Sequence, residues 1–170
     1  MKLYAGIGSR ETPIDILKQM TSLAIALAND NYILRSGGAE GADTAFEIGA
    51  TRKEIYLPWN GFNNRYADGK SYLLIAETEQ AREYVYDYHP SGLYLKPGPL
   101  KLMIRNTYQI LGADLNTPAD TVFCWTCDGK ASGGTGQAMR IAKDYNIPIV
   151  NLYHANQLDN WLDKNKIVLA

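Results

Sequence analysis

The sequence predicts an α/β fold: a Rossmann-like, doubly wound, mostly parallel sheet of about five or more strands with helices on both faces. Two observations predict it. Short apolar runs alternate with longer segments of helical periodicity, and glycine-rich turns follow three of those runs. Such alternation is typical of β-α-β units, whose strands are buried on both faces. The 170 residues suffice for one hydrophobic core, so we expect a single domain over residues 1–170.

The first half of the chain predicts three strands and two helices. Apolar runs indicate strands at residues 2–8, 31–36 and 53–58, and helical periodicity indicates helices at 13–29 and 42–51. Pro13 suits a first helical turn, and the apolar residues that follow it recur on one helix face.

The second half begins with an expected loop at residues 59–69, which are aromatic and polar without a regular period. We expect this loop to lie over a site, because its aromatic side chains need a surface to cover. A helix is predicted at 70–89, and a break rich in proline and glycine follows it. The remaining pattern predicts helices at 100–112, 134–146 and 155–165, with strands at 120–125 and 147–152.

The charges nearly balance, with 17 Lys and Arg against 18 Asp and Glu, so bulk attraction to a polyanion is not expected. No apolar run approaches membrane-spanning length, and no charged-then-apolar leader precedes the first strand. We therefore expect a cytoplasmic protein with no membrane partner. Cys124 and Cys127 form a lone C-x-x-C pair, far in sequence from His89 and His154, so no metal and no cofactor is expected.

The functional signal lies in three stretches that follow expected strands: "GIGSRETP" at 6–13, "SGGAEGADTAFE" at 36–47 and "SGGTGQAMRIA" at 132–142. The carboxyl ends of parallel strands share one edge of a sheet, where doubly wound folds bind their ligands. Glycines there allow a phosphate to approach, and free N–H groups of the next helix complete an anion site. The expected binding residues are Gly8, Ser9, Arg10, Ser36, Gly37, Gly38, Gly41, Asp43, Asp128, Gly133, Gly134, Thr135 and Gly136.

Acidic side chains accompany these turns. Asp43 and Glu47 are four residues apart and so share one helix face. That face would hold a ribose hydroxyl or supply an acid and a base; the alternative is a solvated face favoured by the helix dipole. Asp128 is a further candidate for ribose contact, against a turn-forming Asp-Gly. None of the stretches matches G-x-G-x-x-G or the Walker pattern, so neither a typical NAD site nor a P-loop is supported.

The motifs "GSR" at 8–10, "SGGAEGAD" at 36–43 and "DTVFCW" at 120–125 followed by "GGTGQAMRIA" resemble the SLOG superfamily of Rossmann-like proteins. This superfamily includes the DprA DNA-processing proteins, the LOG cytokinin-riboside phosphoribohydrolases and the small YspA- and YpsA-like proteins. The resemblance spans about residues 3–152 and looks closest to small stand-alone, often phage-encoded members. Because family members are often dimers or larger, it also implies a homo-oligomer, with the tyrosine-rich segment 70–88 as a candidate contact.

The LOG resemblance implies hydrolysis of an N-glycosidic bond. Its pattern P-G-G-x-G-T-x-x-E is matched at Gly133, Gly134 and Gly136, but Arg140 stands where the family has a glutamate. Arg105 would be the family arginine, and Glu47 or Asp43 would have to supply the carboxylate. The DprA resemblance instead implies single-stranded DNA, which needs a basic groove with stacking aromatics. The candidates for it are Arg10, Arg35, Arg52, Lys53, Arg65 and Lys70 with Trp59, Phe62 and Tyr66.

The sequence thus predicts a protein that binds a nucleotide or nucleotide-derived phosphorylated ligand as a sensor, carrier or sequestering protein. Ser9 and Arg10 would hold the phosphate together with backbone N–H groups of the second and third turns. Asp43 would contact the sugar, and Trp59 or tyrosines would stack on the base. The alternatives are a LOG-like hydrolase that uses Glu47, Asp43 and Arg105, and a DprA-like protein that binds single-stranded DNA.

Overall fold

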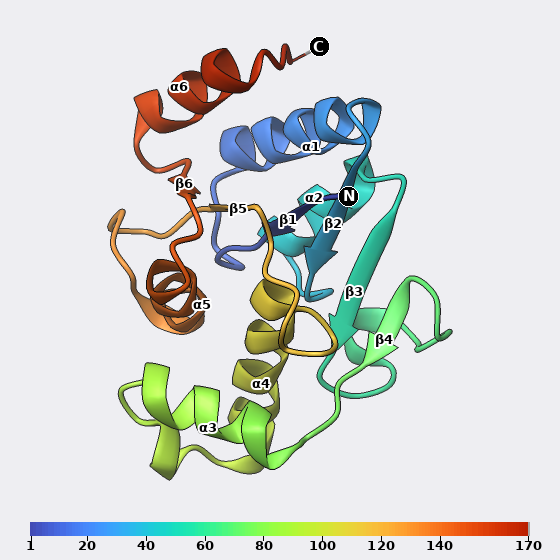
Figure 1. Ribbon diagram of the computed structural model, residues 1–170, viewed down its shortest axis with the longest axis vertical. Coiled ribbons are helices and arrows are strands. Elements are labelled where there is room, and N and C mark those ends of the chain that lie inside the picture. The colour runs from blue at the N-terminus through green and yellow to red at the C-terminus, as the bar shows by residue number, and fades with distance from the viewer. Residues whose placement is uncertain (170) are drawn as a thin grey trace.

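The computed structural model describes residues 1–169, and a six-stranded sheet forms the centre of the molecule (Figure 1). Its strands are β1 (Lys2–Gly6), β2 (Tyr32–Ser36), β3 (Lys53–Leu57), β4 (Tyr72–Leu74), β5 (Thr121–Cys124) and β6 (Ile149–Asn151). They lie in the order β4-β3-β2-β1-β5-β6, and every neighbouring pair is parallel. The predicted α/β, Rossmann-like class is confirmed.

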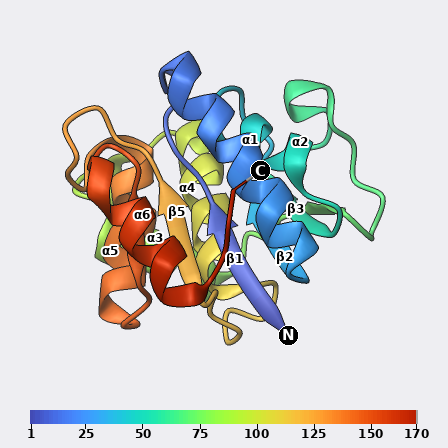
Figure 2. The same ribbon diagram turned by 90° about the horizontal axis from the view of Figure 1, so that it is seen from above.

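Helices cover both faces of the sheet. They are α1 (Ile14–Asn29), α2 (Ala42–Gly49), α3 (Glu79–Tyr88), α4 (Pro97–Leu111), α5 (Gly133–Asp144) and α6 (Ala155–Asn165). Helices α1, α2 and α6 share one face, and α3, α4 and α5 share the other (Figures 1 and 2). Within residues 1–169, none of the helices combines the length and the apolar character that crossing a bilayer needs.

Each face of the sheet buries its own hydrophobic core, because successive side chains of a strand point to opposite faces. Tyr4 of β1 enters the core beneath α1 and α2, where its ring meets Phe46 and Phe123 edge-on. The next residue, Ala5, enters the core beneath α4 and α5, together with Ile104 and other apolar residues of those helices. The two cores fix the strand ends, and with them the turns that follow the strands.

The single helix predicted over residues 70–89 is wrong. Asp68 accepts hydrogen bonds from the backbone N–H groups of Lys70, Ser71 and Tyr72 at 2.8, 3.0 and 2.9 Å, and this turn starts the edge strand β4 against β3. Helix α3 begins only at Glu79, after Thr78 has capped it by accepting the Ala81 N–H at 3.1 Å. The other expected elements are present, with shifts of a few residues at their ends.

The sheet has a topological switch point between β1 and β5. From β1 the chain moves outward through β2 and β3 to β4, and then returns to the other side of β1 as β5. Figure 2 shows β1 and β5 side by side at the centre of the molecule. Ligands of doubly wound folds bind at the carboxyl ends of the strands at such a point.

Candidate functional site

A cavity of about 450 Å³ opens at the carboxyl ends of β1, β2 and β5, at the switch point. We call it the switch-point cavity. Its walls come from the three turns that follow these strands and from helix α4. The lining residues are Ile7, Gly8, Ser9, Arg10, Glu11, Ala39, Asp43, Leu102, Met103, Arg105, Asn106, Gln109, Thr126, Cys127, Ser132, Gly133, Gly134, Thr135 and Ala138.

The turn after β1 contributes Gly8, Ser9 and Arg10 to the lining. A side chain at Gly8 would begin only 2.7 Å from the Ala42 Cβ, so the turn packs directly against the start of α2. The Ser9 hydroxyl oxygen accepts the Glu11 N–H at 3.0 Å, which leaves its own proton available to a ligand. The Arg10 guanidinium is exposed at the same wall.

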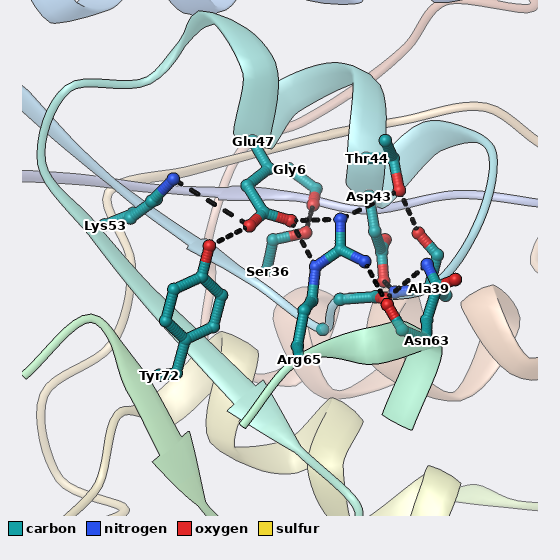
Figure 3. Close-up of polar contacts among 12 residues, drawn as sticks. Gly6, Ser36, Ala39, Asp43, Thr44, Glu47, Lys53, Asn63, Arg65 and Tyr72 are labelled. Carbon is teal, nitrogen blue, oxygen red and sulfur yellow. Dashed lines mark hydrogen bonds and ion pairs between the residues drawn. The ribbon is translucent and has the colours of Figure 1, made fainter. Parts of the chain in front are cut away.

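The turn after β2 contributes few lining residues and mainly packs against the other turns of the wall. Ala39 and Asp43 face the cavity, whereas Ser36, Gly37, Gly38 and Gly41 are not among its lining residues. At Gly41 the φ angle is +81°, and a Cβ would lie 2.7 Å from the Ser9 carbonyl oxygen, so glycine lets the first two turns touch. The Ser36 hydroxyl donates to the Gly6 carbonyl at 2.6 Å, which ties β2 to β1 (Figure 3).

The turn after β5 leads into α5, which begins at Gly133. Gly133, Gly134 and Thr135 line the cavity, and N–H groups of a first helical turn have no acceptor within the helix. This helix start is the expected anion site. Gly136 is not among the lining residues, and its N–H donates to the Ser132 carbonyl at 2.9 Å.

Asp128 organises this last turn instead of lining the cavity. Its carboxylate accepts the Lys130 N–H at 3.0 Å and the Ser132 hydroxyl at 2.9 Å. These hydrogen bonds, the Lys130 N–H first, lower the pKa of Asp128 below its ordinary value. The geometry thus corresponds to the turn-forming alternative. Nearby Cys127 is an exposed free thiol that lines the cavity, and Cys124 is buried at the end of β5.

Helix α4 supplies a buried positive charge. Arg105 is 8% exposed; its guanidinium donates to the Gly37 carbonyl at 3.2 Å and to the Asn106 side chain at 3.1 Å. Its Nε–H is buried and has no hydrogen-bond partner among residues 1–169. Gly37 has room for this contact because it lacks a Cβ, which would lie 2.7 Å from that nitrogen. Desolvation lowers the pKa of Arg105, which means that burial of the charged guanidinium costs free energy.

Asp43 is the buried negative group of the cavity, with 3% of its surface exposed. Its carboxylate accepts the Ala39 N–H at 3.2 Å. Burial raises the pKa of Asp43 above its ordinary value, and the charge of Arg105 acts in the opposite direction. None of the ion pairs found within residues 1–169 joins Asp43 to Arg105. Two buried ionisable groups therefore line one cavity without a direct ion pair between them.

Glu47 lies outside the lining of the cavity, although it is one helical turn from Asp43 (Figure 3). Its carboxylate pairs with Arg65 at 2.7 Å and with Lys53 at 3.8 Å. It also accepts a hydrogen bond from the Tyr72 hydroxyl. Both carboxylate oxygens of Glu47 are thus in contact with other parts of the protein.

Sequence reasoning missed Asn106 and Gln109, which line the cavity from α4 beside Arg105. Gln109 is 1% exposed and lies one helical turn beyond Arg105, so the i, i+4 spacing was the available signal. Conversely, Trp59 was expected to stack on a base, but neither Trp59 nor any tyrosine is among the lining residues of the described chain.

Three of the six cations in the candidate basic patch for DNA pair with carboxylates of the same chain. Arg35 is buried, pairs with Glu54 at 2.8 Å and also donates to the Thr117 carbonyl. Arg65 and Lys53 both pair with Glu47, and the Arg52 guanidinium donates to the Asn31 carbonyl at 2.9 Å. Of the expected cations, Arg10 is the one that lines the cavity.

The sequence matches no protein-family model and no curated protein sequence. Two solved structures are similar in fold. DNA processing protein A (DprA) from Helicobacter pylori, described for its single-stranded DNA binding mode, matches with a TM-score of 0.62 and 18% identity over 96% of this chain and 73% of that chain. DprA from Streptococcus pneumoniae matches with a TM-score of 0.52 and 16% identity. The match covers 88% of this chain and 49% of the Streptococcus pneumoniae chain. The chain therefore has a Rossmann-like α/β fold similar to that of DprA proteins.

Proposed function

We propose that the switch-point cavity binds a nucleotide or a nucleotide-derived phosphorylated ligand, and that the chain is a member of the SLOG superfamily. The observation that carries this proposal is Arg105, a buried guanidinium with an unpartnered Nε–H in the wall of a cavity. A buried charge costs free energy unless it is paired, so such a group is maintained where an anion arrives. The cavity of about 450 Å³ falls within the usual size of small-molecule sites.

The wall divides into parts that match the parts of a nucleotide. Arg10, the Ser9 hydroxyl and the free N–H groups at the start of α5 are donors for phosphate oxygens. Asp43 is an acceptor for sugar hydroxyls, and Leu102 and Met103 offer apolar surface to a base. With these roles the protein would act as a sensor, a carrier or a sequestering protein.

The test is a panel of nucleoside monophosphates, ADP-ribose and cyclic dinucleotides added to the purified protein. A ligand that binds only the native state raises the melting temperature, by an amount that grows with its concentration. We expect at least one member of the panel to raise it, and its intact recovery by chromatography to show that it is bound without turnover. A panel that leaves the melting temperature unchanged would contradict the proposal.

A hydrolase is the second candidate, because Asp43 is a buried carboxyl group in the cavity wall with a raised pKa. A carboxyl group with a raised pKa is suited to donate a proton to a leaving base. Release of free base from a panel member, lost in Asp43→Asn and only reduced in Glu47→Gln, would favour this activity. The contrast is informative because Glu47 lies outside the lining.

Single-stranded DNA is the third candidate, favoured by the fold shared with DprA. Of the cations suggested for DNA, Arg35, Lys53 and Arg65 pair with carboxylates and Arg10 lines the cavity, so the strand would insert a nucleotide into the same cavity. A mononucleotide should then compete with the strand for the protein.

A further inference from the structure

The 59–69 loop is attached to the second turn and to α2 by side-chain contacts (Figure 3). Arg65 donates to Glu47 at 2.7 Å, to the Asn63 carbonyl at 2.8 Å and to the Thr44 hydroxyl at 3.3 Å. The Asn63 side chain donates to the Gly38 carbonyl at 3.0 Å. One guanidinium thus connects the loop to α2, and one amide connects it to the turn after β2.

Glu47 anchors this attachment from three elements at once. The carboxylate belongs to α2 and receives Lys53 from β3, the Tyr72 hydroxyl from β4 and Arg65 from the loop. Its side chain is 8% exposed and that of Arg65 is 17% exposed. An ion pair shielded to this degree is held more firmly than a surface pair, because removing one partner leaves the other buried and unpaired.

Phe62, on the same loop, connects the loop to the cavity through its contact with Arg105. Phe62 is buried, and its ring centroid lies 5.5 Å from the Arg105 Cζ. The Trp59 ring is edge-on to the Phe62 ring, with the two centroids 5.2 Å apart. A cation over an aromatic face is attracted to the ring, and a guanidinium stacks on it readily. The Arg105 guanidinium is therefore confined between the Phe62 ring, the Gly37 carbonyl and the Asn106 side chain.

We propose that Phe62 is a positioning residue for anion binding: the Glu47–Arg65 ion pair fixes the 59–69 loop, and the loop holds the Phe62 ring against Arg105, the group that receives the ligand. This inference rests on the proposed function and assigns the loop a role in it. Glu47, suggested by the sequence as a catalytic carboxylate, acts here through Arg65 and Phe62.

The test uses the full chain, with inorganic pyrophosphate as the anion probe, and two readouts. Calorimetry measures pyrophosphate affinity, and ¹H–¹⁵N spectra follow the Arg105 Nε–H signal, assigned from its absence in Arg105→Lys. Phe62→Leu should weaken pyrophosphate binding about tenfold and shift the Nε–H signal, because the ring is lost. Phe62→Tyr should retain both, and Glu47→Gln should change both in the direction of Phe62→Leu by a smaller amount.

Tyr66→Leu is the matched control, since it removes an exposed aromatic ring from the same loop. It should leave affinity and the Nε–H signal as in the wild type. Normal pyrophosphate binding in Phe62→Leu, or an equal loss in Tyr66→Leu, overturns this inference alone. A wild-type protein that binds neither pyrophosphate nor any nucleotide overturns the proposed function as well. If Phe62→Leu does not fold, Phe62→Tyr and Glu47→Gln still decide the outcome.

Discussion

Arg105 is the residue at which ligand binding and stability should respond in opposite ways. Its guanidinium is buried, and none of the ion pairs within residues 1–169 includes it. A buried charge without an ion-pair partner costs free energy, so an apolar side chain of similar volume removes that cost, which offsets the loss of the two Arg105 hydrogen bonds. We therefore expect Arg105→Met to keep the unfolding free energy within about 1 kcal/mol of the wild type or to raise it. The same variant should lose the thermal stabilisation by nucleotides.

Lys101→Met is the matched control for this comparison, because Lys101 lies on the same helix with its side chain partly exposed. Thermal melts with and without ligand should show unchanged ligand stabilisation in this control. A large fall in the ligand-free melting temperature of Arg105→Met would assign Arg105 a structural role in place of a binding role.

The raised pKa of Asp43 implies that its contribution to stability decreases as the pH rises. Burial raises its pKa above the ordinary value of 3.8, so in that range the folded state binds more protons than the unfolded state. Stability from this group is complete at low pH and is lost as the pH rises through the raised pKa. The melting temperature of the wild type minus that of Asp43→Asn should therefore fall as the pH is raised from about 4.

Asp128→Asn gives the opposite sign and serves as the control. Hydrogen bonds, from the Lys130 N–H first, lower the pKa of Asp128, so its contribution is present above the ordinary value and is lost as the pH falls. Parallel pH profiles for the wild type and Asp43→Asn would show that Asp43 titrates normally and would contradict the structural account.

The contact between the turn after β2 and the turn after β1 depends on Gly41. Ala at Gly41 would have to adopt a φ of +81°, and its Cβ would lie 2.7 Å from the Ser9 carbonyl oxygen. We expect Gly41→Ala to lower the unfolding free energy by about 2–4 kcal/mol and to weaken nucleotide binding, because the turn at 8–10 must move. Chemical denaturation and calorimetry measure the two effects.

Gly69→Ala is the control that separates the free-energy cost of a positive φ from the cost of the steric contact between the two turns. Gly69 has a φ of +70°, but within residues 1–169 no atom beyond its own and those of its two chain neighbours lies within 4 Å of the place that a Cβ would occupy. This variant should therefore lose only about 1 kcal/mol and bind normally. Equal losses in the two variants would mean that the contact between the turns contributes nothing.

The elements also show what the sequence could and could not predict. Strands and turns with strong local signals, such as the run before Ser36 and the glycines at 133–136, were predicted near their observed places. The segment 70–89 was mispredicted because pairing with β3 and the Asp68 turn outweighed its helical periodicity. Glu47 shows the same limit for the site: sequence spacing gives a shared helix face, whereas its partners Arg65 and Tyr72 come from elements distant in the chain.

For the molecule as a whole, the salt dependence of binding can distinguish a small ligand in the cavity from a DNA strand on an extended surface. The net charge is −1, and the cations free to meet a phosphate in the cavity are Arg10 and Arg105. Two phosphate contacts on a single strand correspond to a slope of about −1.4 when log K is plotted against log salt concentration. We expect any binding of a deoxyoligonucleotide, measured by fluorescence anisotropy, to show a slope this shallow and to be displaced by the nucleotide that stabilises the protein. A slope steeper than about −3, with no displacement, would instead require an extended phosphate-binding surface. The protein would then bind DNA outside the cavity, and the small-ligand proposal would lose its support.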